Sequence, residues 1–104
     1  MEISATKVAQ VIVLARELDR AEGEFRAFVD RLGVDEQAEL VALMWIGRGS
    51  YDAEELDEAI AMATAEASTP TADYLIGTPH LSDHLETALD ALNISAVELE
   101  NDLM

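Results

Sequence analysis

The sequence predicts an all-α fold: a compact bundle of about six to seven short helices around a central apolar helix at about residues 36–48. Three observations indicate this class. Apolar residues recur at three- and four-residue spacing, which is the period of a helix. There is no alternating strand pattern and no Asn-Gly or Asp-Gly hairpin turn. Alanine, leucine and glutamate, which all favour helix, are abundant.

The length and composition favour one helical domain that spans residues 1–104. A chain of this size buries roughly two-thirds of its unfolded surface, and 50% of its residues are hydrophobic. It has no cysteine, which excludes disulfides, thiolate metal sites and cysteine nucleophiles. No stretch approaches the roughly 20 apolar residues that span a bilayer, and the N-terminus lacks a signal-peptide pattern. We therefore expect a cytoplasmic protein.

Two amphipathic helices are expected at the N-terminal end. The first begins after a cap at Ser4 and runs to about Asp19, and its apolar residues keep helical spacing. The second runs from about Glu22 to Leu32, with Gly23 as the weak point between the two. Gly33 then suits the C-terminus of the second helix.

The third helix is predicted to be the centre of the fold. Asp35 can cap it, and its middle, Leu40–Ile46, is seven apolar residues in a row. A helix that is hydrophobic all round is normally a buried one, so we expect Trp45 to be a large part of the core. Gly47 and Gly49 are expected to end this helix.

Capping signals divide the second half into further helices. Asp52 and Glu55 form the pattern of a capping box at the start of a helix that fades near Ser68. Thr69-Pro70 and Thr78-Pro79 each predict a cap followed by proline in the first helical position. The remaining signals are helix ends at Gly77 and Asn93 and a capping box at Ser95 and Glu98.

Two long segments carry a resemblance. They are ELVALMWIGRG at Glu39–Gly49, followed by YDAEE, and TADYLIGTPHLSDHLE at Thr71–Glu86. Through them the chain resembles a family of small bacterial domains of unknown function, over about residues 8 to 92. The resemblance implies a bacterial helical domain and brings no assigned activity with it.

The charge is large and uneven. The formal net charge is −16, all six basic residues lie at or before Arg48, and thirteen acids follow it. Direct binding to nucleic acid or to an anionic membrane is not expected, because both need basic patches. The favoured function is a non-catalytic interaction module that binds a basic protein surface, with a nucleic-acid mimic as its sharpest form. Glu54, Glu58 and Glu66 are the expected partner contacts. A solvated acidic surface with no partner, and a homo-oligomer, both stay open.

The two histidines suggest an alternative function in metal binding. His80 and His84 stand four residues apart on an expected helix, so both rings can face one ion, and Asp83 is a nearby acid. Zinc needs three or four protein ligands, so the spacing is necessary and not sufficient. No cofactor is expected otherwise, and the plain interpretation is two surface histidines.

The loop around Arg48 suggests a second alternative, an enzyme or a small-anion binder. Its flanking glycines let a ligand approach the backbone, its guanidinium can hold a carboxylate or phosphate, and Tyr51 follows closely. A structural interpretation stays open, in which glycines end a helix and Arg48 pairs with second-half acids. Catalysis is not expected, because Ser82 is next to Asp83 and His84 in sequence and helical neighbours face different sides.

Overall fold

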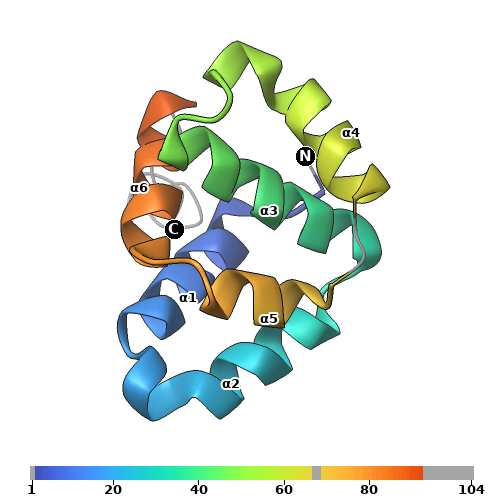
Figure 1. Ribbon diagram of the computed structural model, residues 1–104. Helices are drawn as coiled ribbons and strands as arrows, with labels where there is room; N and C mark the ends of the chain where they lie inside the picture. The colour runs from blue at the N-terminus through green and yellow to red at the C-terminus, as the bar shows by residue number, and fades with distance from the viewer. Residues whose placement is uncertain (1, 67–68, 93–104) are drawn as a thin grey trace, which may run out of the picture.

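The computed structural model describes residues 2–66 and 69–92, and these form an all-α bundle (Figure 1). Within them there are six α-helices, one short 3-10 helix and no strand, which confirms the predicted fold class. The elements are α1 (Ala5–Arg16), α2 (Leu18–Arg31), α3 (Val34–Arg48), η1 (Ala53–Glu55), α4 (Leu56–Ala65), α5 (Thr71–Ile76) and α6 (Leu81–Ala91).

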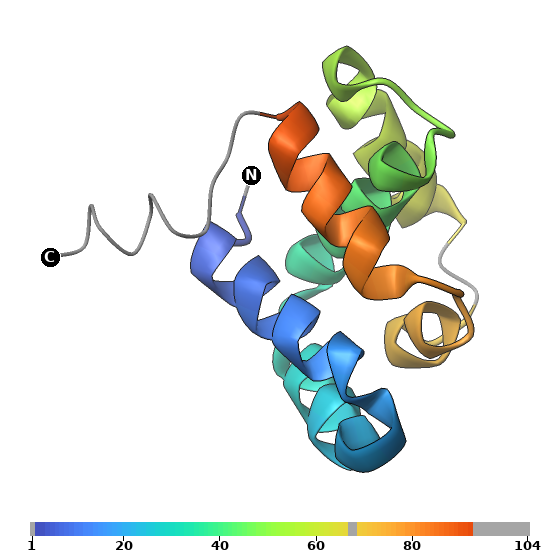
Figure 2. The same cartoon turned by 90° about the vertical axis from the view of Figure 1, so that its left-hand side faces the viewer.

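The helix α3 lies at the centre, as the apolar run predicts. Figure 1 shows it crossing the middle of the molecule, with α4 above it, α5 below it and α6 at one side. Figure 2 shows α6 lying between α1 and α3, and α1 also packs against α2. Every residue from Glu39 to Ile46 is buried, and Trp45 is 8% exposed. The central helix and its buried tryptophan are therefore confirmed.

The break between the first two helices differs from the expectation. Ser4 caps α1 as predicted, since its hydroxyl accepts from the backbone N–H of Lys7 at 3.1 Å. However, α1 ends at Arg16, and the non-helical residue inside α2 is Ala21 and not Gly23. After α1 ends, the chain turns so that α2 packs on α1. The small side chain of Ala21 is buried.

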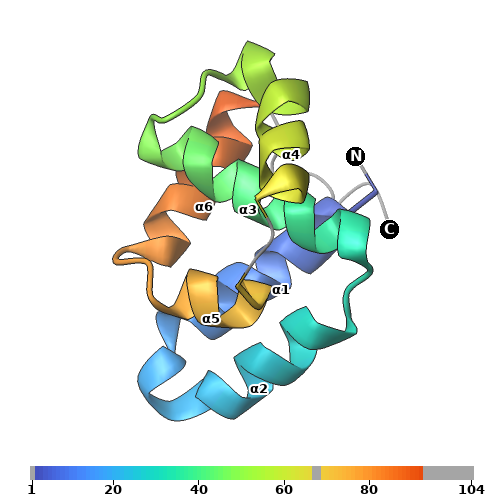
Figure 3. The same ribbon diagram turned by 45° about the vertical axis from the view of Figure 1, so that its right-hand side comes forward.

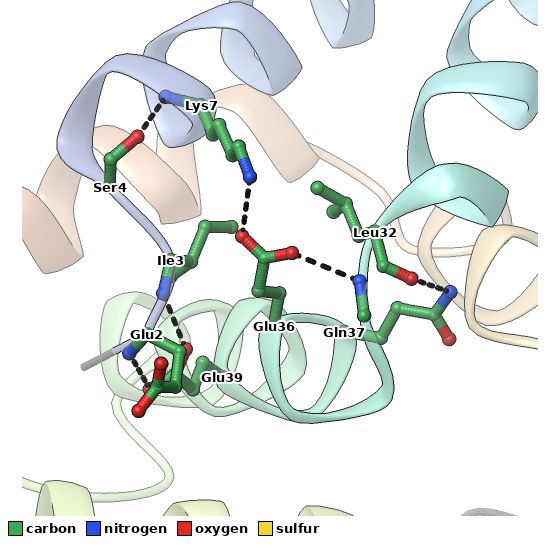
Figure 4. Close-up of polar contacts among 9 residues, drawn as sticks. Glu2, Ile3, Ser4, Lys7, Leu32, Glu36, Gln37 and Glu39 are labelled. Atoms are coloured by element: carbon green, nitrogen blue, oxygen red, sulfur yellow. Dashed lines mark hydrogen bonds and ion pairs between the residues drawn. The ribbon is translucent and has the colours of Figure 1, made fainter.

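The junction of α2 and α3 also corrects the sequence-based prediction. The helix α2 ends at Arg31 with Leu32 as its C-cap, so Gly33 follows its end as predicted. Gly33 is also the N-cap of α3, and Asp35 lies in the first turn and is not the cap. Figure 4 shows the reason: the side chain of Glu36 reaches back and accepts from the Gly33 N–H at 2.9 Å. Gln37 Nε2 donates to the carbonyl of Leu32 at 3.2 Å, which holds the end of α2 against α3.

A buried carboxylate ties the N-terminal segment to α3. The oxygens of Glu39, which is 5% exposed, accept from the backbone N–H groups of Glu2 and Ile3, each at 2.7 Å (Figure 4). One turn earlier, Lys7 Nζ donates to Glu36 at 2.8 Å, and this hydrogen bond lowers the pKa of the Glu36 carboxyl, with a further contribution from the Gly33 N–H. The spacing of apolar residues in the sequence does not predict that the Glu39 carboxylate is buried.

The second-half signals are partly confirmed. The backbone N–H of Asp52 donates to Glu55 at 2.9 Å, as the capping box predicts, and η1 leads into α4. Pro70 is the N-cap of α5 and not its first helical residue. The helix expected from Ser95, and the ends expected at Ser68 and Asn93, lie outside the described residues.

The start of α6 departs further from the prediction. The N-cap is His80, and the helix begins at Leu81, so Pro79 is not in the first helical position. The hydroxyl of Thr78 donates to the Tyr74 carbonyl at 3.0 Å. Thr78 therefore completes the end of α5 and does not cap α6. The backbone of His80 has a φ of 58°, in the left-handed region that is uncommon outside glycine.

One of the two predicted helix-ending glycines has a different role. Gly49 is the C-cap of α3 with a φ of 92°, as expected. Gly47 lies inside the helix, where α6 crosses it. A Cβ atom on Gly47 would lie 1.6 Å from the carbonyl oxygen of His84, so only glycine allows this approach of the two backbones.

We expect Gly47→Ala to destabilise the fold by about 1–3 kcal/mol or more, because the added methyl forces α3 and α6 apart. Gly23→Ala is the matched control, since a Cβ atom added at Gly23 would meet no packed neighbour within 4 Å. At this exposed position of α2 the substitution should add about 0.5–1 kcal/mol of stability. Urea unfolding followed by circular dichroism measures both, and equal effects of the two substitutions would contradict the close crossing.

Candidate functional site

A group of acids lies on and beside η1 and α4. Glu54, Glu58 and Glu66, the expected partner contacts, are all exposed, and so are two neighbouring acids. None of these side chains forms an ion pair within residues 2–66 and 69–92. We call this set the α4 acidic face: Asp52, Glu54, Asp57, Glu58 and Glu66.

Four of the six cations form ion pairs away from this face. Lys7 pairs with Glu36 at 2.8 Å, and Arg16 pairs with Glu86 of α6. Arg26 pairs with Asp73 of α5 and with Glu22 of its own helix, and the hydrogen bond to Asp73 is the main cause that raises the Arg26 pKa. Arg20 pairs with Glu17 at 3.5 Å. Two arginines therefore reach the second half at α5 and α6, whereas α4 receives none of these contacts.

The structure brings the two sites predicted from the sequence together. Arg48, His80 and His84 line one open hollow of about 590 Å³, which we call the Arg48 hollow. The Arg48 guanidinium donates from Nε to the hydroxyl of Ser50 at 3.1 Å. Its expected pairing with a second-half acid does not occur among the described residues. The remaining lining residues are Asp73, Tyr74, Gly77, Thr78 and Pro79.

The metal site is only partly assembled by these residues. His80 Nδ1 lies 3.9 Å from Asp83 Oδ2, and both side chains are largely exposed. Within the described part of the chain, no group of three or more histidines and acids is placed to hold a metal ion. Since zinc needs three or four protein ligands, the predicted use of these residues as ligands stays a prediction.

Tyr51 lies away from the Arg48 hollow. Its ring stacks on that of Trp45, with centroids 5.8 Å apart and planes at 23°. Such a stacked pair adds stability beyond the area it buries. The packing against Trp45 gives Tyr51 a structural role in the loop after α3.

A second recess, lined by α3, α4, α5 and the residues beside them, is not predicted from the sequence. It has a volume of about 230 Å³ and mostly apolar walls, and we call it the Trp45 groove. Val34 at its edge is 77% exposed, although it is fully apolar. The groove is lined by Val34, Gln37, Ala38, Val41, Trp45, Ala63, Thr64, Glu66, Thr69, Thr71 and Tyr74. Periodicity marks Trp45 as core and gives no signal for a groove, because the walls come from separate elements.

Comparison with known proteins supports the resemblance and adds no activity. The model of a family described as "Protein of unknown function (DUF3775)" matches residues 22–94. Searches of the curated proteins and of the solved structures each found no match. Across the described residues, no helix combines the length and apolar character that crossing a membrane requires.

We expect sodium chloride to stabilise the fold against heat. At about 0.1 M salt the screening length is about 10 Å, which damps the repulsion among neighbouring carboxylates. The exposed ion pairs weaken as well, but such pairs contribute only about 0–1 kcal/mol each. Differential scanning fluorimetry measures the melting temperature, and Glu54→Gln, Glu58→Gln, Glu66→Gln should gain less from salt. A melting temperature that falls as salt is first added would contradict this.

Proposed function

The chain belongs to the DUF3775 family of proteins of unknown function, so a function has to be inferred from its own surface. We propose that it is a non-catalytic interaction module for a basic protein partner. The observation that carries the proposal is the α4 acidic face. Five exposed carboxylates lie on η1 and α4 or at their caps, with no ion pair among the described residues, although six cations exist in the chain.

The location of the α4 acidic face supports binding at one end of the molecule. Figures 1 and 3 place α4 at the end opposite α2, which carries Arg20, Arg26 and Arg31. Because salt screens charge with distance, arginines at the opposite end of the molecule reduce the field of the α4 carboxylates less than neighbouring cations would. A basic surface that approaches this end is attracted and oriented before contact.

A nucleic-acid mimic is the sharpest form of this proposal. In that form the partner is a nucleic-acid-binding protein, and its basic surface meets the α4 carboxylates where it would otherwise meet phosphates. Competition separates this form from the general one. Duplex DNA should displace the chain from such a partner, and it should leave any other basic partner bound.

Neutralising the α4 acidic face should slow association without unfolding the protein. The test variant is Glu54→Gln, Glu58→Gln, Glu66→Gln, and all three side chains are exposed. The matched control removes the same charge from α2, as Asp19→Asn, Glu24→Gln, Asp30→Asn, again at exposed positions. Wild type and both variants serve as baits in parallel, and mass spectrometry identifies proteins that wild type and the control retain and the test variant loses.

Kinetics on the purified partner then decide the proposal. The association rate should fall steeply between about 0.1 and 0.5 M salt, because charge attraction sets the encounter rate. The test variant should be slower than the control at low salt, with the difference shrinking as salt rises. A partner that binds both variants equally, or that contacts the arginines of the first half, would show that the acids serve solubility.

The meeting of Arg48, His80 and His84 in one hollow favours a second candidate, the binding of a small anion. A guanidinium with two imidazoles suits a carboxylate or phosphate. Inorganic phosphate titrated into the protein should shift the histidine ring proton resonances, and Arg48→Gln should abolish the shift. Arg31→Gln, at an exposed arginine that also has no ion pair among the described residues, should not. Zinc added to the same sample tests the metal alternative, and unchanged resonances with both ions would reject both.

A further inference from the structure

We infer that the Trp45 groove receives one apolar side chain of the basic partner, so that the partner segment carries cations beside a single apolar anchor. This inference rests on the proposed function and specifies its partner. The groove adjoins the α4 acidic face, since Glu66 belongs to both. A segment that places an apolar side chain in the groove brings its flanking cations next to the carboxylates of α4.

The size of the groove suits a side chain. Its volume of about 230 Å³ is below the roughly 300–1,000 Å³ of sites for drug-sized ligands and cofactors. Val41 and Trp45 of α3 form part of the floor and keep a small exposed fraction of 8% each, while Ala63 of α4 leaves room because its side chain is short. The groove therefore has space for an aliphatic side chain and lacks space for a large cofactor.

Three donor groups of the groove, on Trp45, Gln37 and Thr64, are already hydrogen-bonded inside the protein. Trp45 Nε1 donates to the hydroxyl of Tyr74 at 2.9 Å, and Gln37 Nε2 donates to the Leu32 carbonyl at 3.2 Å. The hydroxyl of Thr64 donates to Ile60 of its own helix at 2.9 Å. A polar occupant that faced these three groups would lose its bonds to water and find their donors already used, whereas an apolar one loses no hydrogen bond there. The chemistry of the walls thus selects an apolar group.

Exposed apolar side chains occur both in the groove and on α4. Val34 lies at the groove edge with 77% of its surface exposed, and Met62 of α4 is 42% exposed. Glu58, Met62 and Glu66 are spaced four residues apart, so they follow one face of α4. Apolar contact area inside a charged rim is the usual composition of a protein interface. The charge of the rim selects a cationic segment.

The test uses two defined peptides and the intrinsic fluorescence of Trp45, the only tryptophan. One is a helical alanine–lysine peptide with a single central leucine, and the other has alanine in its place. The leucine peptide should bind wild type about tenfold more tightly, the factor expected when the extra aliphatic carbons are buried. Val34→Gln should lower this ratio. Val13→Gln, at an apolar residue of α1 that is 50% exposed and does not line the groove, should leave the ratio unchanged.

The outcomes separate this inference from the proposed function. The variant Glu54→Gln, Glu58→Gln, Glu66→Gln should weaken both peptides and keep their ratio. Equal affinity of the two peptides for wild type, with weaker binding to that variant, overturns the groove and leaves the proposed function standing. Unchanged binding to the variant overturns the proposed function. A concentration-dependent dimer that Val34→Gln abolishes shows that a second copy occupies the groove, and it overturns the inference.

Discussion

The fold depends on the need to cover α3 on every side. Eight consecutive residues, Glu39–Ile46, are buried on this one helix, and a helix has no side that such a run leaves free for water. Each neighbouring element meets part of that surface: α6 and α4 along much of its length and α5 at another face. Tight packing here depends on one missing side chain, because α6 passes so near Gly47 that its backbone occupies the place of a Cβ atom.

The same requirement places the charges. Since the interior is reserved for α3 and the residues that pack on it, none of the second-half acids from Asp52 to Asp90 is buried. In the first half, by contrast, the carboxylate of Glu39 is buried and accepts two backbone hydrogen bonds from the N-terminal segment. A buried carboxylate is tolerated when donors satisfy it in this way. The covering helix α4 buries only the small side chains of Ala59 and Ala63, so the surface over Trp45 is thinly covered and the groove remains.

What the sequence predicts well is local or depends on one helical period. The run at Leu40–Ile46 identifies the central helix, and the caps at Ser4 and Asp52 are confirmed, because each depends on residues within one turn. The errors arise where distant segments decide. The Thr78 hydroxyl bonds to the end of α5 and does not cap α6. Gly47 is required where α6 crosses α3, and no local sequence pattern indicates that crossing. The same reason limited the sites: the sequence predicts both histidines on one helix, whereas His80 is the N-cap of α6 with a left-handed backbone, and only the tertiary fold places Arg48 in the same hollow.

The groove and the hollow are not independent, because Tyr74 lines both. The Tyr74 hydroxyl accepts the hydrogen bond from the Trp45 indole N–H. The next residue before it on α5 is Asp73, which forms an ion pair with Arg26. An occupant of the groove therefore touches a residue that also forms a wall of the Arg48 hollow. A substitution of Tyr74 would alter both recesses and would leave the Trp45 indole N–H without its hydrogen-bond acceptor. Its effect on binding could therefore not be attributed to the groove or to the hollow alone. Val34 and Arg48 each line only one of the two, and substitutions there separate an apolar, cation-bearing partner from a small anion.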